Sequence, residues 1–165
     1  MILVIPTLIY SMYLCRMSHH FLLILHLLGA AVWVGGHLVL ALGILPEVLK
    51  KRDPELLLAF ERKYEKIGIP ALLIMVITGI WMAYQFGVDV SQWFHFANPV
   101  ETAVSVKLTL LFTTILFALS ANIFVLPKLS TRTLPVMAFH IICVTVIGIL
   151  MLIVGSFFRY GGLSF

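Results

Sequence analysis

Residues 25–41 read LHLLGAAVWVGGHLVLA, an apolar stretch with a histidine near each end. His26 and His37 are eleven residues apart. At about 100° per residue, this spacing is within roughly 20° of three full turns, so both imidazoles lie on one face of a helix. They stand about 16 Å apart along its axis. Ala30 and Trp33 share the stripe, and small residues flank it: Gly29, Gly35 and Gly36.

Such a helix lies in lipid or in the core of a bundle, where ionisable side chains are costly and usually functional. The alternative is that the two histidines only pack and form hydrogen bonds. Two imidazoles on one stripe beside glycines favour the functional interpretation.

The composition places the chain in a membrane. Of its 165 residues, 62% are hydrophobic and 11% charged, and the mean hydropathy is +1.12. A soluble domain of this size could not cover so much apolar surface, so we predict an all-α, polytopic membrane protein with the lipid bilayer as its main partner. The net charge of +4 reflects loop composition rather than nucleic-acid binding. Cys15 and Cys143 do not suggest a disulfide framework.

Four spans are expected, at about residues 20–45, 67–86, 99–126 and 135–158, arranged as an up-down bundle. Residues 17–165 form this domain, whereas residues 1–16 are an N-terminal extension that need not belong to the mature protein. Pro46 is expected to end the first span. Asp53-Pro54 and Asn98-Pro99 both read as an N-cap followed by proline, and the helix from Asp53 is expected to continue into the second span.

The basic residues predict the topology. Eight of the eleven lie in two connections that face the same side: Lys50, Lys51, Arg52, Arg62, Lys63, Lys66, Lys128 and Arg132. The positive-inside rule places these connections in the cytoplasm of a bacterial inner membrane, with both termini periplasmic.

All seven acidic residues lie in loops or at helix starts, which argues against a carboxylate-based proton pump. The candidate functional side chains that remain within the membrane are His26, His37, Lys107, Asn122 and His140. On antiparallel helices, His37 and His140 reach a similar depth, and His26 reaches the depth of Met151 or Lys107. The sequence therefore predicts a lower tier in which His37 and His140 share a ligand, and an upper tier around His26.

Two kinds of metal centre fit these tiers. Imidazoles from facing helices suit the axial positions of one haem, with the glycines making room for the porphyrin. Alternatively, Met137, His140 and Cys143 recur every three residues, and Met75 and Met82 share a face of the second span. Sulfur and imidazole ligands favour Cu(I). Lys107 either snorkels outward or binds a haem propionate or substrate carboxylate.

Three stretches carry a family resemblance: LHLLGAAVWVGG, FERKYEKIGIPALLIMVITGIW and the third span with Lys107. They resemble the CopD-type copper-resistance membrane proteins and the related HemJ-type protoporphyrinogen oxidases, over nearly all of residues 20–160. The resemblance to the oxidases implies that a histidine in the first span and a lysine in the third span are functional. In this sequence these residues are His26 and Lys107. Two departures favour the CopD type: Leu45-Pro46-Glu47 replaces a proline followed by arginine, and the fourth span carries His140 in place of a polar Asn-Glu segment.

The leading hypothesis is thus an inner-membrane metal-centre protein that binds haem b or copper through His26, His37, His140 and Met151, with Lys107 beside the cofactor. It would serve copper handling or electron transfer, with a quinone, a periplasmic copper protein or a second copy of the chain as partner. The alternatives are a HemJ-like porphyrinogen oxidase and a non-catalytic scaffold subunit.

Overall fold

The computed structural model describes the backbone of residues 4–163 and the side chains of residues 17–163. The described chain is helical, and four of its helices are long and apolar enough to cross a membrane: Met17–Lys51, Pro54–Gln85, Pro99–Lys128 and Leu134–Tyr160. This confirms the predicted all-α membrane bundle. The side chains of the expected extension, residues 1–16, lie outside the described residues.

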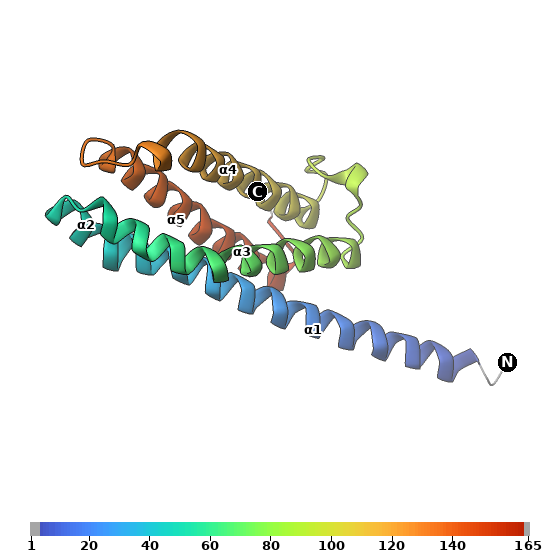
Figure 1. Ribbon diagram of the computed structural model, residues 1–165. Coiled ribbons are helices and arrows are strands. Elements are labelled where there is room, and N and C mark those ends of the chain that lie inside the picture. The colour runs from blue at the N-terminus through green and yellow to red at the C-terminus, as the bar shows by residue number, and fades with distance from the viewer. Residues whose placement is uncertain (1–3, 164–165) are drawn as a thin grey trace.

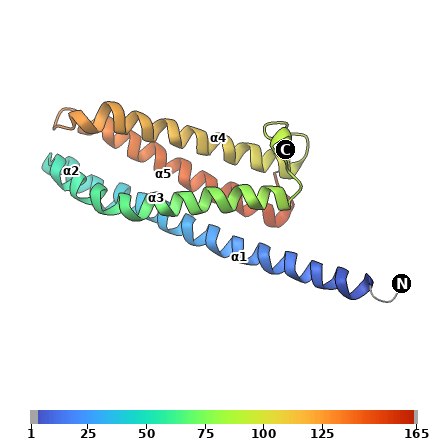
Figure 2. The ribbon, with the colours of Figure 1, turned by 45° about the vertical axis from the view of Figure 1, so that its right-hand side comes forward.

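The helices form two antiparallel pairs (Figures 1 and 2). In one pair, α1 (Val4–Leu38) packs along α3 (Pro54–Gln85); in the other, α4 (Pro99–Ser120) packs along α5 (Leu134–Phe157). Contacts between α1 and α5 join the pairs. A short helix, α2 (Leu45–Lys51), connects α1 to α3 at one end of the bundle, and the α4–α5 connection lies at that same end.

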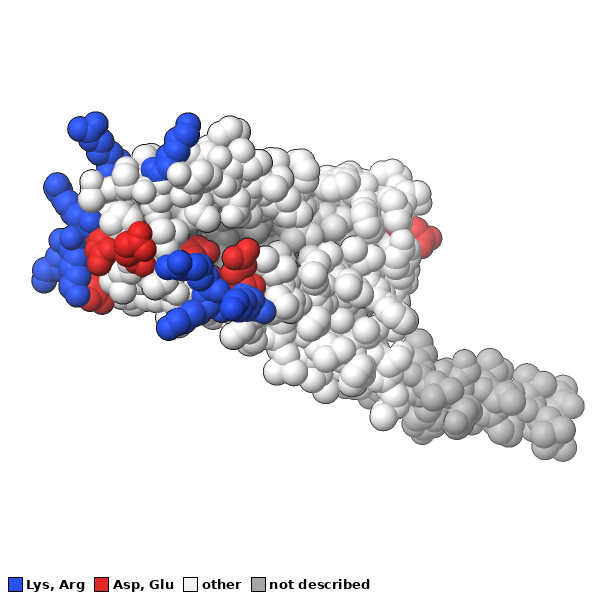
Figure 3. Space-filling view, viewed as in Figure 1, with Lys and Arg blue, Asp and Glu red and all other residues white. Residues whose placement is uncertain are grey.

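That end carries the positive charge and is called the basic end below. Figure 3 shows Lys and Arg gathered over α2, the α4–α5 connection and the N-terminal half of α3. At the opposite end, Leu163 N donates to Pro99 O at 2.8 Å, which holds the C-terminal segment against the start of α4. Large apolar side chains such as Leu42, Phe112 and Phe124 are exposed along the bundle, as expected for a lipid-facing surface.

The prediction that Pro46 ends the first span is wrong. A π-helical segment, Val39–Ile44, carries the chain directly from α1 into α2, and Leu45 N donates to Leu40 O. The wider turn lets the helix accommodate a proline, which has no N–H to donate. A second π segment, Ala121–Val125, follows α4 just before Pro127. The first helix ends instead at Arg52, whose left-handed φ of 53° reverses the chain.

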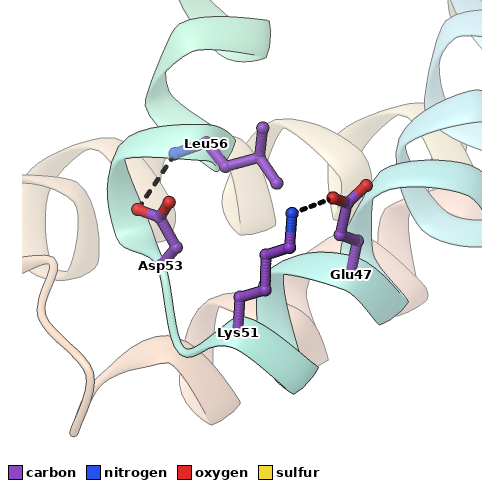
Figure 4. Close-up of polar contacts among 4 residues, drawn as sticks. All are labelled: Glu47, Lys51, Asp53 and Leu56. Atoms are coloured by element: carbon purple, nitrogen blue, oxygen red, sulfur yellow. Dashed lines mark hydrogen bonds and ion pairs between the residues drawn. The ribbon is translucent and has the colours of Figure 1, made fainter.

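Both predicted N-caps are confirmed. The Asp53 carboxylate accepts from Glu55 N and Leu56 N and starts α3, which continues without a break to Gln85 (Figure 4). Figure 4 also shows the exposed ion pair between Glu47 and Lys51. The Asn98 side chain likewise accepts from Val100 N and Glu101 N.

A packed core occupies the basic end. It contains nine buried apolar residues from α2, α3, α5 and the two π segments: Leu40, Leu45, Val48, Leu57, Val125, Leu134, Met137, Ala138 and Ile141. Leu57 and Val48 are completely buried. The helices are therefore locked together at this end, which leaves the opposite end as the place where space can remain between them.

Candidate functional site

A cavity of about 950 Å³ lies between the four long helices in the half of the bundle away from the basic end. This volume is in the range of ligand-binding pockets. Each helix contributes to the wall, with His26 on α1, Met82 on α3, Lys107 on α4 and Met151 on α5. Trp93 adds a side chain from the α3–α4 connection. Most of the lining is apolar, so the few polar groups determine what the cavity can bind.

Two contacts between the helix pairs bound this cavity. On the side of the basic end, Gly148 of α5 fits against Trp33 and Val34 of α1, where an added Cβ would lie 3.4 Å from both side chains. At the opposite end, the Phe86 and Phe158 rings meet with their centroids 5.4 Å apart. We call this second contact, and the surface around it, the mouth end.

The His26 ring is held by a hydrogen bond from α3. Its Nδ1 lies 3.0 Å from Thr78 Oγ1, and the Thr78 hydroxyl donates its own proton to Ile74 O at 2.6 Å. Nδ1 must therefore donate to Thr78, which leaves the lone pair on Nε2. Gly79 makes room for the ring, because an added Cβ would lie 3.1 Å from His26 Cε1. A hydrogen bond from one ring nitrogen is also what fixes the tautomer and orientation of metal-binding histidines.

Lys107 has no counter-charge among the residues whose side chains are described. Within residues 17–163, its Nζ makes no hydrogen bond or ion pair, and its recorded ring contact is with Phe158, 5.7 Å from the centroid. Gly155 provides the space, since an added Cβ would lie 3.4 Å from Nζ. Arg159 also lines the cavity, and no described Asp or Glu does. The cavity therefore combines apolar walls with uncompensated positive charge.

The structure thus brings three of the five predicted site residues to one cavity: His26, Lys107 and Met151. These are the residues that the sequence assigned to the upper tier. The thioether of Met151 and the free Nε2 of His26 are both available to a cofactor or substrate in this space.

The two histidines of the predicted lower tier make separate contacts. His37 Nδ1 donates to Trp33 O at 2.9 Å, beside Tyr64 from α3. His140 instead lies against α4, where Nδ1 donates to Val136 O at 2.8 Å and Nε2 accepts from Ser120 Oγ at 3.1 Å. Among the described side chains, no hydrogen bond or ring contact joins the two histidines. Both ring nitrogens of His140 thus take part in hydrogen bonds, and the ligand shared with His37 stays a prediction.

The expected role of the glycines also needs correction at two positions. An added Cβ at Gly36 would overlap the Tyr64 ring, and one at Gly29 would lie 2.9 Å from Ala71 O. Both glycines therefore allow α3 to approach α1, and neither makes room for a porphyrin. The glycines that line the cavity are instead Gly79 and Gly155, on α3 and α5, and they make room for His26 and Lys107.

The sulfur ligands proposed for copper lie in two regions. Met137 is buried in the core at the basic end, whereas Met75 and Met82 line the cavity together with Met151 and His26. Within residues 17–163, no group of three or more His, Cys, Asp or Glu side chains is placed to hold a metal ion.

Sequence reasoning missed several residues of the site. Thr78, which fixes the His26 ring, was detectable as a polar residue inside an apolar span. Arg159 lies just past the expected end of the fourth span, and Phe158 resembles any other apolar residue there.

No protein-family model matches the chain, and no curated protein or solved structure matches it significantly. The resemblance to CopD-type and HemJ-type proteins therefore stays a prediction, and function must be argued from the cavity.

Proposed function

We propose that this protein is a membrane-integral haem b protein of CopD type that serves electron transfer in copper handling. One observation carries the proposal: a tautomer-fixed imidazole and an uncompensated lysine line the same large, mainly apolar cavity. A porphyrin has a wide apolar body, a metal that accepts nitrogen ligands, and two acidic propionates. The cavity offers a complementary group for each of these features.

Different residues of this chain would bind different parts of the cofactor. His26 would ligate the iron through Nε2, and Thr78 would keep the ring in the correct tautomer. Met151 offers a thioether as a second ligand. Lys107 and Arg159 would bind the propionates, and the apolar walls would exclude water. When bound, haem b supplies a one-electron Fe(III)/Fe(II) couple.

Direct copper binding is supported less well. The Nε2 of His140 accepts a hydrogen bond from Ser120, and Met137 lies in the packed core. We therefore place copper on a partner, such as a periplasmic copper protein, and assign a membrane quinone as the other redox partner.

We further propose that the membrane is a bacterial inner membrane, with the basic end in the cytoplasm and the mouth end and both termini in the periplasm. The distribution of Lys and Arg supports this orientation (Figure 3). Reporter fusions test it: a fusion at residue 55 should behave as cytoplasmic, and one after residue 163 as periplasmic. The opposite pattern would reverse the orientation.

The same pair of residues supports a second candidate, a HemJ-like oxidase. His26 can accept a proton beside Lys107, which can bind a substrate carboxylate. Incubation of the purified protein with protoporphyrinogen and a quinone distinguishes this candidate, because only an oxidase would accelerate the appearance of porphyrin fluorescence.

The absorption spectrum of the purified protein tests the main proposal. We expect a Soret band, with resolved α and β bands after reduction by dithionite. Protein that binds copper without this spectrum would contradict the haem proposal. Protein that takes up neither haem nor copper from a medium containing both would favour the scaffold interpretation.

A further inference from the structure

The loop that connects α3 to α4 at the mouth end exposes apolar side chains. Residues 87–98 read GVDVSQWFHFAN, in which Asp89 is the one Asp, Glu, Lys or Arg residue. Figure 1 draws this loop in yellow-green beside the start of α4. Val90, Phe94 and Phe96 are 55%, 53% and 50% exposed. Exposed apolar side chains that gather in one place mark contact with a membrane or with a partner.

The two phenylalanines also have a strained backbone. Phe94 has a φ of 67° and Phe96 a φ of 56°, both in the left-handed region. This region is unfavourable for a residue with a bulky side chain, and it persists only where the surrounding structure fixes it. Such strained residues cluster at functional positions. The contacts of the loop therefore show what its conformation serves.

Two buried side chains of α4 fix the loop. The Glu101 carboxyl group accepts hydrogen bonds from Ala97 N at 3.2 Å and from Asn98 Nδ2 at 2.8 Å. The completely buried Ser105 accepts from Phe94 N at 3.0 Å and donates its own proton to Glu101 O at 2.7 Å. Glu101 and Ser105 are therefore positioning residues for the aromatic loop.

The N–H groups of this loop are paired within the protein. Besides the two that α4 accepts, Trp93 N donates to Val90 O at 3.2 Å and His95 N donates to Gln92 O at 3.1 Å. An unpaired backbone group is costly where water is scarce, as it is toward the interior of a bilayer. A loop in water can leave such groups to the solvent. The internal pairing thus favours a position in the membrane interface.

The surface next to the loop faces lipid as well. Trp81 and Tyr84 are exposed in the last turns of α3, directly before the loop begins. Tryptophan and tyrosine side chains are enriched at the membrane–water interface. The exposed apolar surface of α3 therefore continues into the loop without an intervening Lys or Arg, whereas the basic side chains gather at the other end of the bundle (Figure 3).

We propose that the α3–α4 loop inserts Phe94 and Phe96 into the phospholipid interface at the mouth end and anchors that end of the bundle there. The partner is the lipid itself, at the level where acyl chains meet headgroups. Trp93 belongs to the same loop and lines the cavity, so the anchored loop also holds part of the cavity wall in place. The inference does not depend on what the cavity binds.

A fluorescent label tests the position of the loop. Cys15 and Cys143 would be replaced by serine in the full-length protein, and a nitrobenzoxadiazole label would be attached at Phe96→Cys. The matched control is a label at Thr131→Cys, in the exposed α4–α5 connection. Phe94→Cys is a second label position in case the first variant does not fold.

The labelled proteins would be studied in liposomes of phosphatidylethanolamine and phosphatidylglycerol. We expect the loop label to emit at shorter wavelength than the control label. Phospholipids with a nitroxide near the headgroup end of the acyl chain should quench the loop label, and iodide on both sides of the membrane should not. The control label should show the reverse pattern, because the α4–α5 connection lies in water.

Substitutions of Glu101 test its positioning role. Glu101→Ala removes the acceptor of Ala97 N and Asn98 Nδ2, so the loop label should lose lipid quenching and gain iodide quenching. Glu101→Gln keeps one acceptor oxygen and should show an intermediate pattern. Glu47→Ala removes an exposed carboxylate at the basic end and should leave both kinds of quenching unchanged.

Equal iodide quenching of the loop label and the control label, without lipid quenching, would overturn the inference, because the loop would then lie in water. A loop label that is shielded from both quenchers would also overturn it, because a protein surface would then cover the loop. Unchanged lipid quenching in Glu101→Ala would overturn the role assigned to Glu101.

Discussion

At the basic end the four helices close on a continuous core, whereas at the mouth end the same helices surround a cavity of about 950 Å³. Two of the histidines differ in the same way. His140, toward the basic end, has both nitrogens hydrogen-bonded, while His26, in the cavity, keeps Nε2 free. Polar residues within one membrane bundle can thus be structural in one half and available for chemistry in the other.

The largest expected difference between the halves is in packing. Leu57→Ala removes a completely buried side chain from the core at the basic end and should lower the free energy of unfolding by about 2–5 kcal/mol. Leu111→Ala should cost less than about 1 kcal/mol, because Leu111 already faces the cavity and has fewer packing partners to lose. The free energy of unfolding of both variants can be measured in mixed micelles. Equal losses of unfolding free energy would show that protein side chains fill the cavity in solution.

The contact between α1 and α3 can be tested with two neighbouring glycines. Gly36→Ala places a methyl group on the Tyr64 ring and should destabilise the protein by about 1–3 kcal/mol. Gly35→Ala is the matched control, since an added Cβ there meets nothing within 4 Å. Thermal unfolding should separate the two variants clearly. Similar melting temperatures would mean that α3 does not approach α1 as closely as described.

A smaller effect is expected from Tyr64→Phe. The Tyr64 hydroxyl donates to Trp33 O at 2.6 Å, and hydrogen bonds between helices in membranes contribute about 0.6 kcal/mol on average. The variant should therefore lose less than about 1.5 kcal/mol of unfolding free energy. Because Tyr64 lies outside the cavity, the haem content of the variant should equal that of the wild type. A loss of haem in this variant would show that the contact between Tyr64 and α1 affects binding in the cavity.

Much of the fold was predictable from local sequence. Apolar runs gave the four spans, and the Asp-Pro and Asn-Pro pairs gave two helix starts, because capping depends on residues next to one another. The continuation past Pro46 was not predictable in this way. Whether a proline ends a helix or is absorbed by a π segment depends on packing around the turn.

The site was only partly predictable for a geometric reason. Helical periodicity placed His26 and His37 on one stripe, but it cannot tell which neighbouring helix that stripe faces. Matched depth suggested that His37 and His140 meet, yet His140 is rotated toward Ser120 on α4. The cavity itself depends on how closely helices pack, as at Gly29 and Gly148, and that is a property of the assembled bundle.

The haem content of two purified histidine variants tests the central claim most directly. His26→Ala removes the imidazole of the cavity and should retain less than about a tenth of the haem per protein found in the wild type, since losing even an outer-shell partner typically weakens metal sites 10–100-fold. His140→Ala, in the packed half, should retain nearly all of it. Wild-type haem content in His26→Ala, or an equal loss in His140→Ala, would contradict the account.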